Sequence, residues 1–489
     1  MRGAAAGTLM ERLSTGDAGL DHVLGGGLPP GSLVVIGGPP GSGKTILAQQ
    51  ICFANANSER KALYYTTWSE PHDKMVRHLE PFAFFELDSL GERVEFLHLA
   101  ELIAGDRADA FASVADEILR RGFESKPAVI VVDSSKALHD VAEPGEFRRA
   151  LFDLASKISY SNAVLILVGE YSASETRSQP EFAVADGILQ LENEARGPID
   201  RRWLRVLKLR GAEPASGQHS FRISTAGVEV FPRLETTLPR PVPTLDTRAS
   251  FGIERLDAAI GGGIPRGDST LLIGPSGVGK TLLALRFVEA GLDAGERCLH
   301  VSFQESEDQV EEKAAAAGWN WKAVDEERLI VRHIPPVEVD LDEVAALIRR
   351  ELAGGDIKRV VVDSLAELAF AARETERLPG YVWALGGFVR AAGGTTIFTN
   401  EMAALGQGGD LGGVSFIFNN VFFLRYIERR SALARVLNVL KMRQSDHEKG
   451  ALSFEIDDCG IRFGEKIEGV SGLLGWSALR DDDRPPTAR

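Results

Sequence analysis

Short apolar runs alternate with longer helical segments along the chain. Five runs in the first half are almost continuously apolar instead of alternating, at residues 33–38, 62–67, 94–99, 128–134 and 163–170. Such runs are typical of strands that are buried on both faces of a sheet. Helical segments, such as residues 45–56 and 145–158, fall between them. We therefore expect an α/β fold with a mainly parallel sheet and helices on both faces.

The same pattern occurs twice. Residues 19–38 (GLDHVLGGGLPPGSLVVIGG) match residues 255–274 (RLDAAIGGGIPRGDSTLLIG), and Lys44 and Lys280 follow at the same spacing of 236 residues. Further along, AVIVVDSS at 128–135 matches RVVVDSLA at 359–366, and VLKLRG at 206–211 matches VLKMRQ at 439–444. The order of the elements is unchanged, so the sequence predicts a tandem duplication of one domain.

The length of the chain agrees with two domains. A single hydrophobic core stops growing at about 250 to 300 residues, and this chain has 489. The proline-rich stretch at 233–248 suits an extended linker better than a helix. We expect an extension at 1–13, a first domain at 14–235, a linker at 236–248, a second domain at 249–470 and a tail at 471–489.

Composition narrows the class of protein. A hydrophobic content of 44% and a charged content of 26% are ordinary for a soluble globular protein. The net charge of −15 argues against a protein that coats nucleic acid. Cys52, Cys298 and Cys459 are too far apart for a disulfide framework. No apolar run reaches the roughly 18 residues that span a bilayer, so we expect a cytoplasmic protein without a membrane partner.

Each repeat carries a glycine-rich phosphate-binding motif directly after an apolar run. The motifs are GPPGSGKT at 38–45 and GPSGVGKT at 274–281. Backbone N–H groups of such a loop surround a phosphate chain, the lysine neutralises β- and γ-phosphate charge, and the threonine offers its hydroxyl to Mg²⁺. A chance glycine turn is the alternative, but it would not carry the full motif twice. The predicted ATP contacts are Gly38, Gly41, Ser42, Gly43, Lys44, Thr45, Gly274, Gly277, Val278, Gly279, Lys280 and Thr281.

Acidic residues complete each predicted site. Asp133 and Asp363 end apolar runs and are expected to hold Mg²⁺ opposite Thr45 and Thr281. Aspartates that merely end a strand at a turn are the alternative.

Hydrolysis also needs a group that orients or deprotonates the attacking water. Glu70 and Glu305 follow the first strand after each phosphate-binding helix and are the candidate catalytic residues. Ordinary surface glutamates are the alternative.

This ordered set of motifs, doubled in one chain, resembles the KaiC family of circadian clock ATPases. The resemblance runs from about residue 20 to about residue 467, and is closest at LDxxxGGGxP, the two phosphate-binding loops, Arg148-Arg149, VLKLRG and NVLKMR. It implies two tandem RecA-like P-loop NTPase domains that bind and hydrolyse ATP with Mg²⁺.

The resemblance also implies a homo-hexamer of two stacked rings, with ATP between neighbouring subunits, and a KaiB-like protein partner. Lys208 and Arg210 in the first ring, and Lys441 and Arg443 in the second, would then contact the γ-phosphate of the adjacent subunit. Positive charge from a neighbour stabilises phosphoryl transfer and couples turnover to assembly. Solvent-facing pairs at a strand edge are the alternative.

Two departures from the family pattern change the expected activity. KaiC-type domains carry two adjacent glutamates where this chain has Ser69-Glu70 and Gln304-Glu305, so we expect slow hydrolysis. The family's Ser-Thr phosphorylation dyad corresponds here to Ser415-Phe416. A two-site phosphorylation cycle is therefore excluded, and Ser415 is either a single autophosphorylation site or an ordinary serine.

Two other functions compete with a KaiC-like ring that acts as a signalling or clock-type switch. A RecA- or RadA-like recombination ATPase, or a helicase, would move on DNA. Against it stand the excess of acidic residues, the absence of a zinc ribbon before the first motif and a single dense cationic run at 201–210.

The second competing function is a nucleotide-gated interaction scaffold with little catalysis, which the missing glutamates favour.

Overall fold

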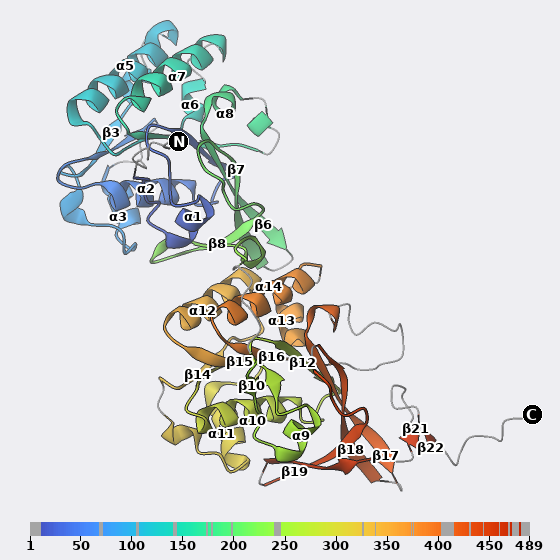
Figure 1. Ribbon diagram of the computed structural model, residues 1–489. Helices are drawn as coiled ribbons and strands as arrows, with labels where there is room; N and C mark the ends of the chain where they lie inside the picture. The colour runs from blue at the N-terminus through green and yellow to red at the C-terminus, as the bar shows by residue number, and fades with distance from the viewer. Residues whose placement is uncertain are drawn as a thin grey trace, which may run out of the picture. The chain divides into compact units, whose positions relative to one another are not determined.

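The structure is a computed structural model of the 489-residue chain. It describes residues 11–67, 72–103, 107–139, 144–172, 175–177, 179–196, 199–238, 246–324, 327–337, 339–372, 374, 376–401, 415–429, 432–443, 445–458, 460–467, 470–471 and 479–480. The chain divides into two compact units, Met1–Thr237 and Leu238–Arg489 (Figure 1).

The described residues of the first unit form nine strands and a set of helices that lie between them in sequence. Its strands are β1 Leu33–Gly38, β2 Ala62–Thr66, β3 Val94–His98, β4 Val129–Asp133, β5 Val164–Glu170, β6 Gly187–Arg196, β7 Ile199–Leu209, β8 His219–Ser224 and β9 Gly227–Phe231. Its α-helices are α1 Ala18–Val23, α2 Lys44–Asn55, α3 His72–Leu79, α4 Ala100–Ile103, α5 Arg107–Ser125, α6 Lys136–His139, α7 Pro144–Ser159 and α8 Pro180–Val184. Short 3₁₀ turns are η1 Leu87–Ser89, η2 Glu175–Arg177 and η3 Leu234–Thr236.

The second unit repeats this order. Its strands are β10 Arg248–Ala249, β11 Ile264–Pro265, β12 Ser269–Gly274, β13 Arg297–Ser302, β14 Leu329–His333, β15 Ile357–Asp363, β16 Thr395–Glu401, β17 Asn420–Arg429, β18 Ala432–Met442, β19 Ala451–Asp457, β20 Gly460–Lys466, β21 Val470–Ser471 and β22 Leu479–Arg480. Its helices are α9 Glu254–Ala259, α10 Lys280–Asp293, α11 Glu307–Ala316, α12 Leu341–Ala353, α13 Leu365–Ala372 and α14 Leu378–Ala391, with 3₁₀ turns η4 Trp321–Ala323 and η5 Ser415–Ile417.

The main sheet has the same strand order in both units. The order is β3-β2-β4-β5-β1-β6-β7-β8-β9 in the first and β14-β13-β15-β16-β12-β17-β18-β19-β20 in the second. In the first sheet the neighbouring strands of the segment β3-β2-β4-β5-β1-β6 pair in parallel, and those of the segment β6-β7-β8-β9 pair antiparallel. The predicted fold class is confirmed, but the five apolar runs did not reveal the antiparallel part, whose strands are only partly buried.

Helices cover both faces of the first sheet, as the apolar runs predicted. Val34 and Ile36 pack with Leu47 of α2 on one face. Leu33 and Val35 belong to the opposite core, with α5 and α7. Figure 1 shows α5 and α7 on one side of this sheet and α1 to α3 on the other. Alternate residues of the fully buried β1 therefore serve two cores, which is why β1 is apolar throughout.

The two ends of the proline-rich stretch at 233–248 belong to secondary structure. Residues 234–236 form the turn η3, and Leu234 is buried. Arg248 and Ala249 form β10, which pairs with β11 of the second unit. Residues 239–245 lie outside the described residues, and the domain boundaries stay a prediction.

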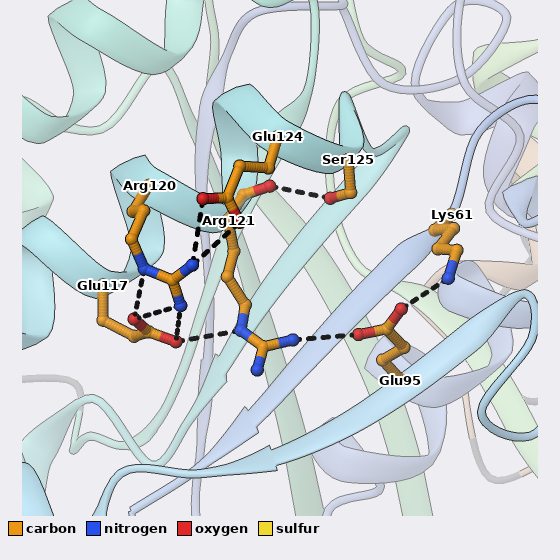
Figure 2. A network of polar contacts seen from close by, with 7 residues as sticks. All are labelled: Lys61, Glu95, Glu117, Arg120, Arg121, Glu124 and Ser125. Carbon is orange, nitrogen blue, oxygen red and sulfur yellow. Dashed lines mark hydrogen bonds and ion pairs between the residues drawn. The ribbon is translucent and has the colours of Figure 1, made fainter.

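Polar contacts tie α5 to the edge of the first sheet (Figure 2). Glu95 on β3 accepts from Lys61 Nζ at 2.6 Å and from Arg121 Nη1 at 3.1 Å. Arg121 also bonds Glu117, which pairs with Arg120. These groups are partly exposed, so solvent screens the pairs and each contributes little to stability, and the network mainly orients the helix.

The second unit has a buried arginine where the first has an apolar residue. Arg359 on β15 is 2% exposed and bonds Glu296 at 2.6 Å. It also donates to the backbone carbonyls of Ser250 and Phe287, at 2.6 and 2.7 Å. By strand register its counterpart is Val129. Arg359 therefore attaches the start of the second unit to α10 and β15.

Across the parts of the chain that the structure describes, no helix is long and apolar enough to cross a bilayer.

Candidate active sites

Each phosphate-binding loop joins the central strand of its sheet to the helix that follows. Gly43 and Gly279 directly precede α2 and α10, at φ of 91° and 112°. A side chain would be strained at this φ. A Cβ at Gly38 or Gly274 would lie 2.2 or 2.1 Å from a backbone carbonyl oxygen. Glycine is therefore required at both positions to let the loop turn beside the neighbouring strand.

The loop lysines fold back over the loop. Lys44 Nζ donates to the Pro39 carbonyl at 2.7 Å, and Lys280 Nζ donates to the Gly274 and Pro275 carbonyls, both at 2.9 Å. Burial lowers the pKa of both lysines, and nearby carboxylates oppose this effect. Because each ammonium is held where few waters reach it, it can interact strongly with an anion that enters.

In the first unit, the strand-end carboxylate lies beside the loop threonine. Asp133 Oδ2 accepts from Thr45 Oγ1 at 2.8 Å and from Tyr64 OH at 2.7 Å. Burial raises the pKa of Asp133, and these two hydrogen bonds oppose the rise. A carboxylate and a hydroxyl this close are the hard oxygen ligands that Mg²⁺ prefers. The predicted metal residues Thr45 and Asp133 are thus adjacent.

The second unit surrounds its aspartate differently. Asp363 accepts a hydrogen bond from Thr399 on β16. By strand register, His300 on β13 takes the place of Tyr64. Its ring is fully buried without a hydrogen-bond partner among the described residues, and burial lowers its pKa to about 4. His300 is therefore neutral near pH 7, and the two aspartates have different neighbours.

Both sites open into cavities. A cavity of about 350 Å³ is lined by Lys44, Thr45 and Asp133 in the first unit. One of about 570 Å³ is lined by Lys280, Thr281 and Asp363 in the second, together with Gly277, Gly279 and the candidate catalytic Glu305. Ser42 and Val278 are buried within their loops and shape the turn.

Glu305 precedes α11 and lies two residues before its first helical residue. Its backbone N–H donates to Ser302 Oγ at 2.9 Å, and its Oε1 forms an ion pair with Lys313. Oε2 is buried and has no hydrogen-bond partner among the described residues. The corresponding Glu70 lies outside the described residues, so its place in the first site stays a prediction.

The four basic residues predicted to act on a neighbour lie far from the loop of their own chain. Leu209, beside Lys208 and Arg210, pairs with Gly187, which pairs with Val34, four residues before the loop begins. Four strand residues span about 13 Å. These side chains are therefore at the amino-terminal edge of the parallel strands, whereas the phosphate-binding loop is at the carboxyl edge.

The same separation holds in the second unit. Met442 pairs with Asn420, which pairs with Thr270, four residues before Gly274. Lys441 Nζ donates to the Phe418 carbonyl at 2.7 Å, and Arg443 Nη2 donates to the Phe416 carbonyl at 3.2 Å. The backbone of Ser415 begins the adjacent turn η5. Ser415, Lys441 and Arg443 therefore share one edge, which is remote from Lys280.

Several residues of the two sites were missed in the sequence. Glu170 and Glu401 end β5 and β16 and line the cavities. Aligning the two copies would have paired them, as it would have paired Tyr64 with His300. Lys313 gave no signal, because it lies on an exposed helix.

Comparison with known proteins also finds two repeats in this chain. The model of the KaiC ATPase family matches residues 13–235 and again residues 249–468. The circadian clock oscillator protein KaiC of Parathermosynechococcus lividus is 27% identical over 484 residues, covering 96% of this chain and 88% of that protein. The circadian clock protein KaiC3 of Synechocystis sp. is 28% identical over 488 residues, covering 96% and 95%. With two RecA-like units and two matching loops, the chain belongs to the KaiC family of ATPases.

Proposed function

We propose that this ATPase binds Mg·ATP at both sites and hydrolyses it slowly in a hexameric double ring, as a nucleotide-driven signalling or clock-type switch. The observation that carries the assembly is the distance between each loop and the basic residues of its own chain. Leu209, between Lys208 and Arg210, lies about 13 Å of strand away from the loop, so a phosphate contact by these two residues requires another subunit.

The residues of each site supply complementary parts of the reaction. Lys44 and Lys280 neutralise phosphate charge, and Thr45 with Asp133, or Thr281 with Asp363, would hold Mg²⁺. The metal neutralises charge on the β- and γ-phosphates when it is bound. Glu305, whose Oε2 has no hydrogen-bond partner among the described residues, would orient the attacking water, and Glu70 would have the same role in the first site.

Only one acid of the family's pair is present at each site, since Ser69 and Gln304 replace the other. One carboxylate can still accept the proton of the water, so hydrolysis continues without its neighbour's help. A slow cycle suits a switch whose nucleotide state controls partner binding, and a KaiB-like protein is the partner we propose.

We expect Glu70→Gln and Glu305→Gln each to remove the hydrolysis of one site while nucleotide stays bound. A general base contributes about 10²- to 10⁴-fold, so the double variant should release phosphate at least about 100-fold more slowly. Steady-state phosphate release together with nucleotide binding measures this. Glu312→Gln, an exposed glutamate on α11, is the matched control. An unchanged rate in the double variant would remove both glutamates from the mechanism.

We also propose that Ser415 accepts the γ-phosphate of ATP bound to an adjacent subunit. The serine oxygen would form a bond to phosphorus as the bond to ADP breaks, and the serine proton would pass to the neighbour's Glu305. The position of η5 on the edge remote from Lys280 supports transfer between subunits rather than within one.

Incubation with Mg·ATP should add the mass of one phosphate per chain, because only the serine of the family's dyad is present. Intact-mass spectrometry measures this, and Ser415→Ala should abolish the gain. Ser453→Ala changes a serine on β19 and is the control. The autokinase proposal fails if no mass is added, or if the Ser415→Ala chain still gains it.

A further inference from the structure

The second site contains a cation that its phosphate-binding motif does not require. Among the residues that the structure describes, two lysines line the 570 Å³ cavity, Lys280 of the loop and Lys313 of α11. The other charged lining residues are acidic: Glu305, Asp363, Glu367, Glu401, Asp457 and Asp458. Of these, Glu305 forms an ion pair with Lys313.

The start of α11 determines how Glu305 and Lys313 meet. Ser306 and Gln309 form a capping box, in which each side chain bonds the backbone of the other. This fixes the point where the helix begins, with Glu305 immediately before the cap. Long helical side chains point toward the helix N-terminus, so Lys313 reaches back two turns to the Glu305 carboxylate.

The two oxygens of this carboxylate have different surroundings. Oε1 is paired with the Lys313 ammonium, whereas Oε2 is buried and unpartnered among the described residues. A buried carboxylate oxygen without a hydrogen bond is costly to maintain. A water molecule in the cavity could supply that bond, and Oε2 would then accept its proton.

We propose that Lys313 is a positioning residue for hydrolysis at the second site. It holds Oε1 of Glu305 and so presents Oε2 to the attacking water. Lys313 does not contact the nucleotide in this assignment. The inference rests on the proposed role of Glu305 and adds to it the group that orients this carboxylate.

The physical basis is the loss of rotamer freedom. An unpaired glutamate at the mouth of a cavity can rotate between several conformers, and a misplacement of about 1 Å can cost up to about 100-fold in rate. The pairing costs little, because the Lys313 side chain is 48% exposed while Glu305 is 18% exposed. Replacing Lys313 therefore leaves no buried unpaired charge at position 313.

The first site has a different residue at this position. His78 on α3 follows Glu70 by eight residues, as Lys313 follows Glu305. His78 lines a cavity of about 710 Å³ that also contains Thr45 and Asp133. Lys313 therefore has a histidine, and not a lysine, as its counterpart in the first unit.

Lys313→Met is tested in the Glu70→Gln background, so that phosphate release reports the second site. We expect kcat to fall about ten-fold and KM for ATP to stay within about two-fold, since Lys313 orients Glu305 and does not bind ATP. Lys313→Arg keeps the cation and should retain most of the rate. Lys322→Met, which changes an exposed lysine on η4, should have no effect.

A double-variant cycle separates positioning from a general structural effect. In the Glu305→Gln background, Lys313→Met should lower kcat less than about two-fold, because residues that act as a unit are not additive. The inference is overturned by an unchanged or increased kcat, by an equal loss in both backgrounds, or by a rise in KM alone. If Glu305→Gln leaves the rate unchanged while Lys313→Met lowers it, the role of Glu305 fails and the positioning role falls with it.

Discussion

Lys280→Ala is expected to empty the second nucleotide site and leave the first one filled. The charge-assisted bonds of this lysine contribute about 1.5 to 3 kcal/mol each, so affinity at this site should fall about 100-fold or more. Calorimetric titration with a non-hydrolysable ATP analogue and Mg²⁺ should show two nucleotides per chain for the unchanged protein and one for the variant. The reciprocal change, Lys44→Ala, should also leave one.

The double variant Lys44→Ala with Lys280→Ala should bind no nucleotide. Lys322→Ala is the matched control and should still bind two. A count of two in Lys280→Ala would show that this loop does not bind the phosphates. One bound nucleotide per chain in the unchanged protein would show that one of the two units does not bind nucleotide.

Arg443→Ala should abolish hydrolysis at the second site, measured in the Glu70→Gln background, while ATP still binds. An arginine supplied by a neighbouring subunit contributes about 10³- to 10⁵-fold to phosphoryl transfer. The Arg443 guanidinium donates to the Phe416 carbonyl at the edge remote from Lys280. Its loss therefore should not affect nucleotide binding to its own chain. Arg350→Ala, an exposed arginine on α12, is the control.

Mixing two inactive chains tests whether the contact lies between subunits. Lys280→Ala has no nucleotide in the second site but keeps Arg443, and Arg443→Ala has the opposite defect. When both are assembled together, some interfaces combine an intact loop with an intact arginine. Activity at the second site should then reappear, whereas neither chain alone has it. Mixtures as inactive as their components would contradict a role in trans.

Local features of the sequence accounted for the layout of each unit. Val34 and Ile36 serve one core and Leu33 and Val35 the other, so an uninterrupted apolar run was sufficient to predict a central strand. Of the antiparallel strands, β7 and β18 were expected as strands, because they carry the Lys208 and Lys441 motifs, whereas the apolar runs did not reveal the others. Their side chains are only partly buried, and partial burial leaves a weaker pattern.

The candidate sites divide in the same way. Lys44, Thr45 and their second-unit counterparts belong to one continuous motif, which the chain brings to a single turn by local geometry. Asp133 was predicted from its place at the end of a buried strand. Tyr64 and Lys313 were not predicted. Tyr64 donates to Asp133, which is distant in sequence, and Lys313 pairs with Glu305, which lies two helical turns away.

The duplicated α/β units, the two phosphate-binding loops and the family could all be recognised from the amino-acid sequence, because they depend on short-range patterns and on repetition. The folded structure was needed to show which side chains face each carboxylate and on which edge of the sheet the basic residues lie. Those relations follow from strand order and register. In each unit β6 or β17 pairs with the central strand, and the chain then reverses direction into β7 or β18. No short segment of sequence contains that information.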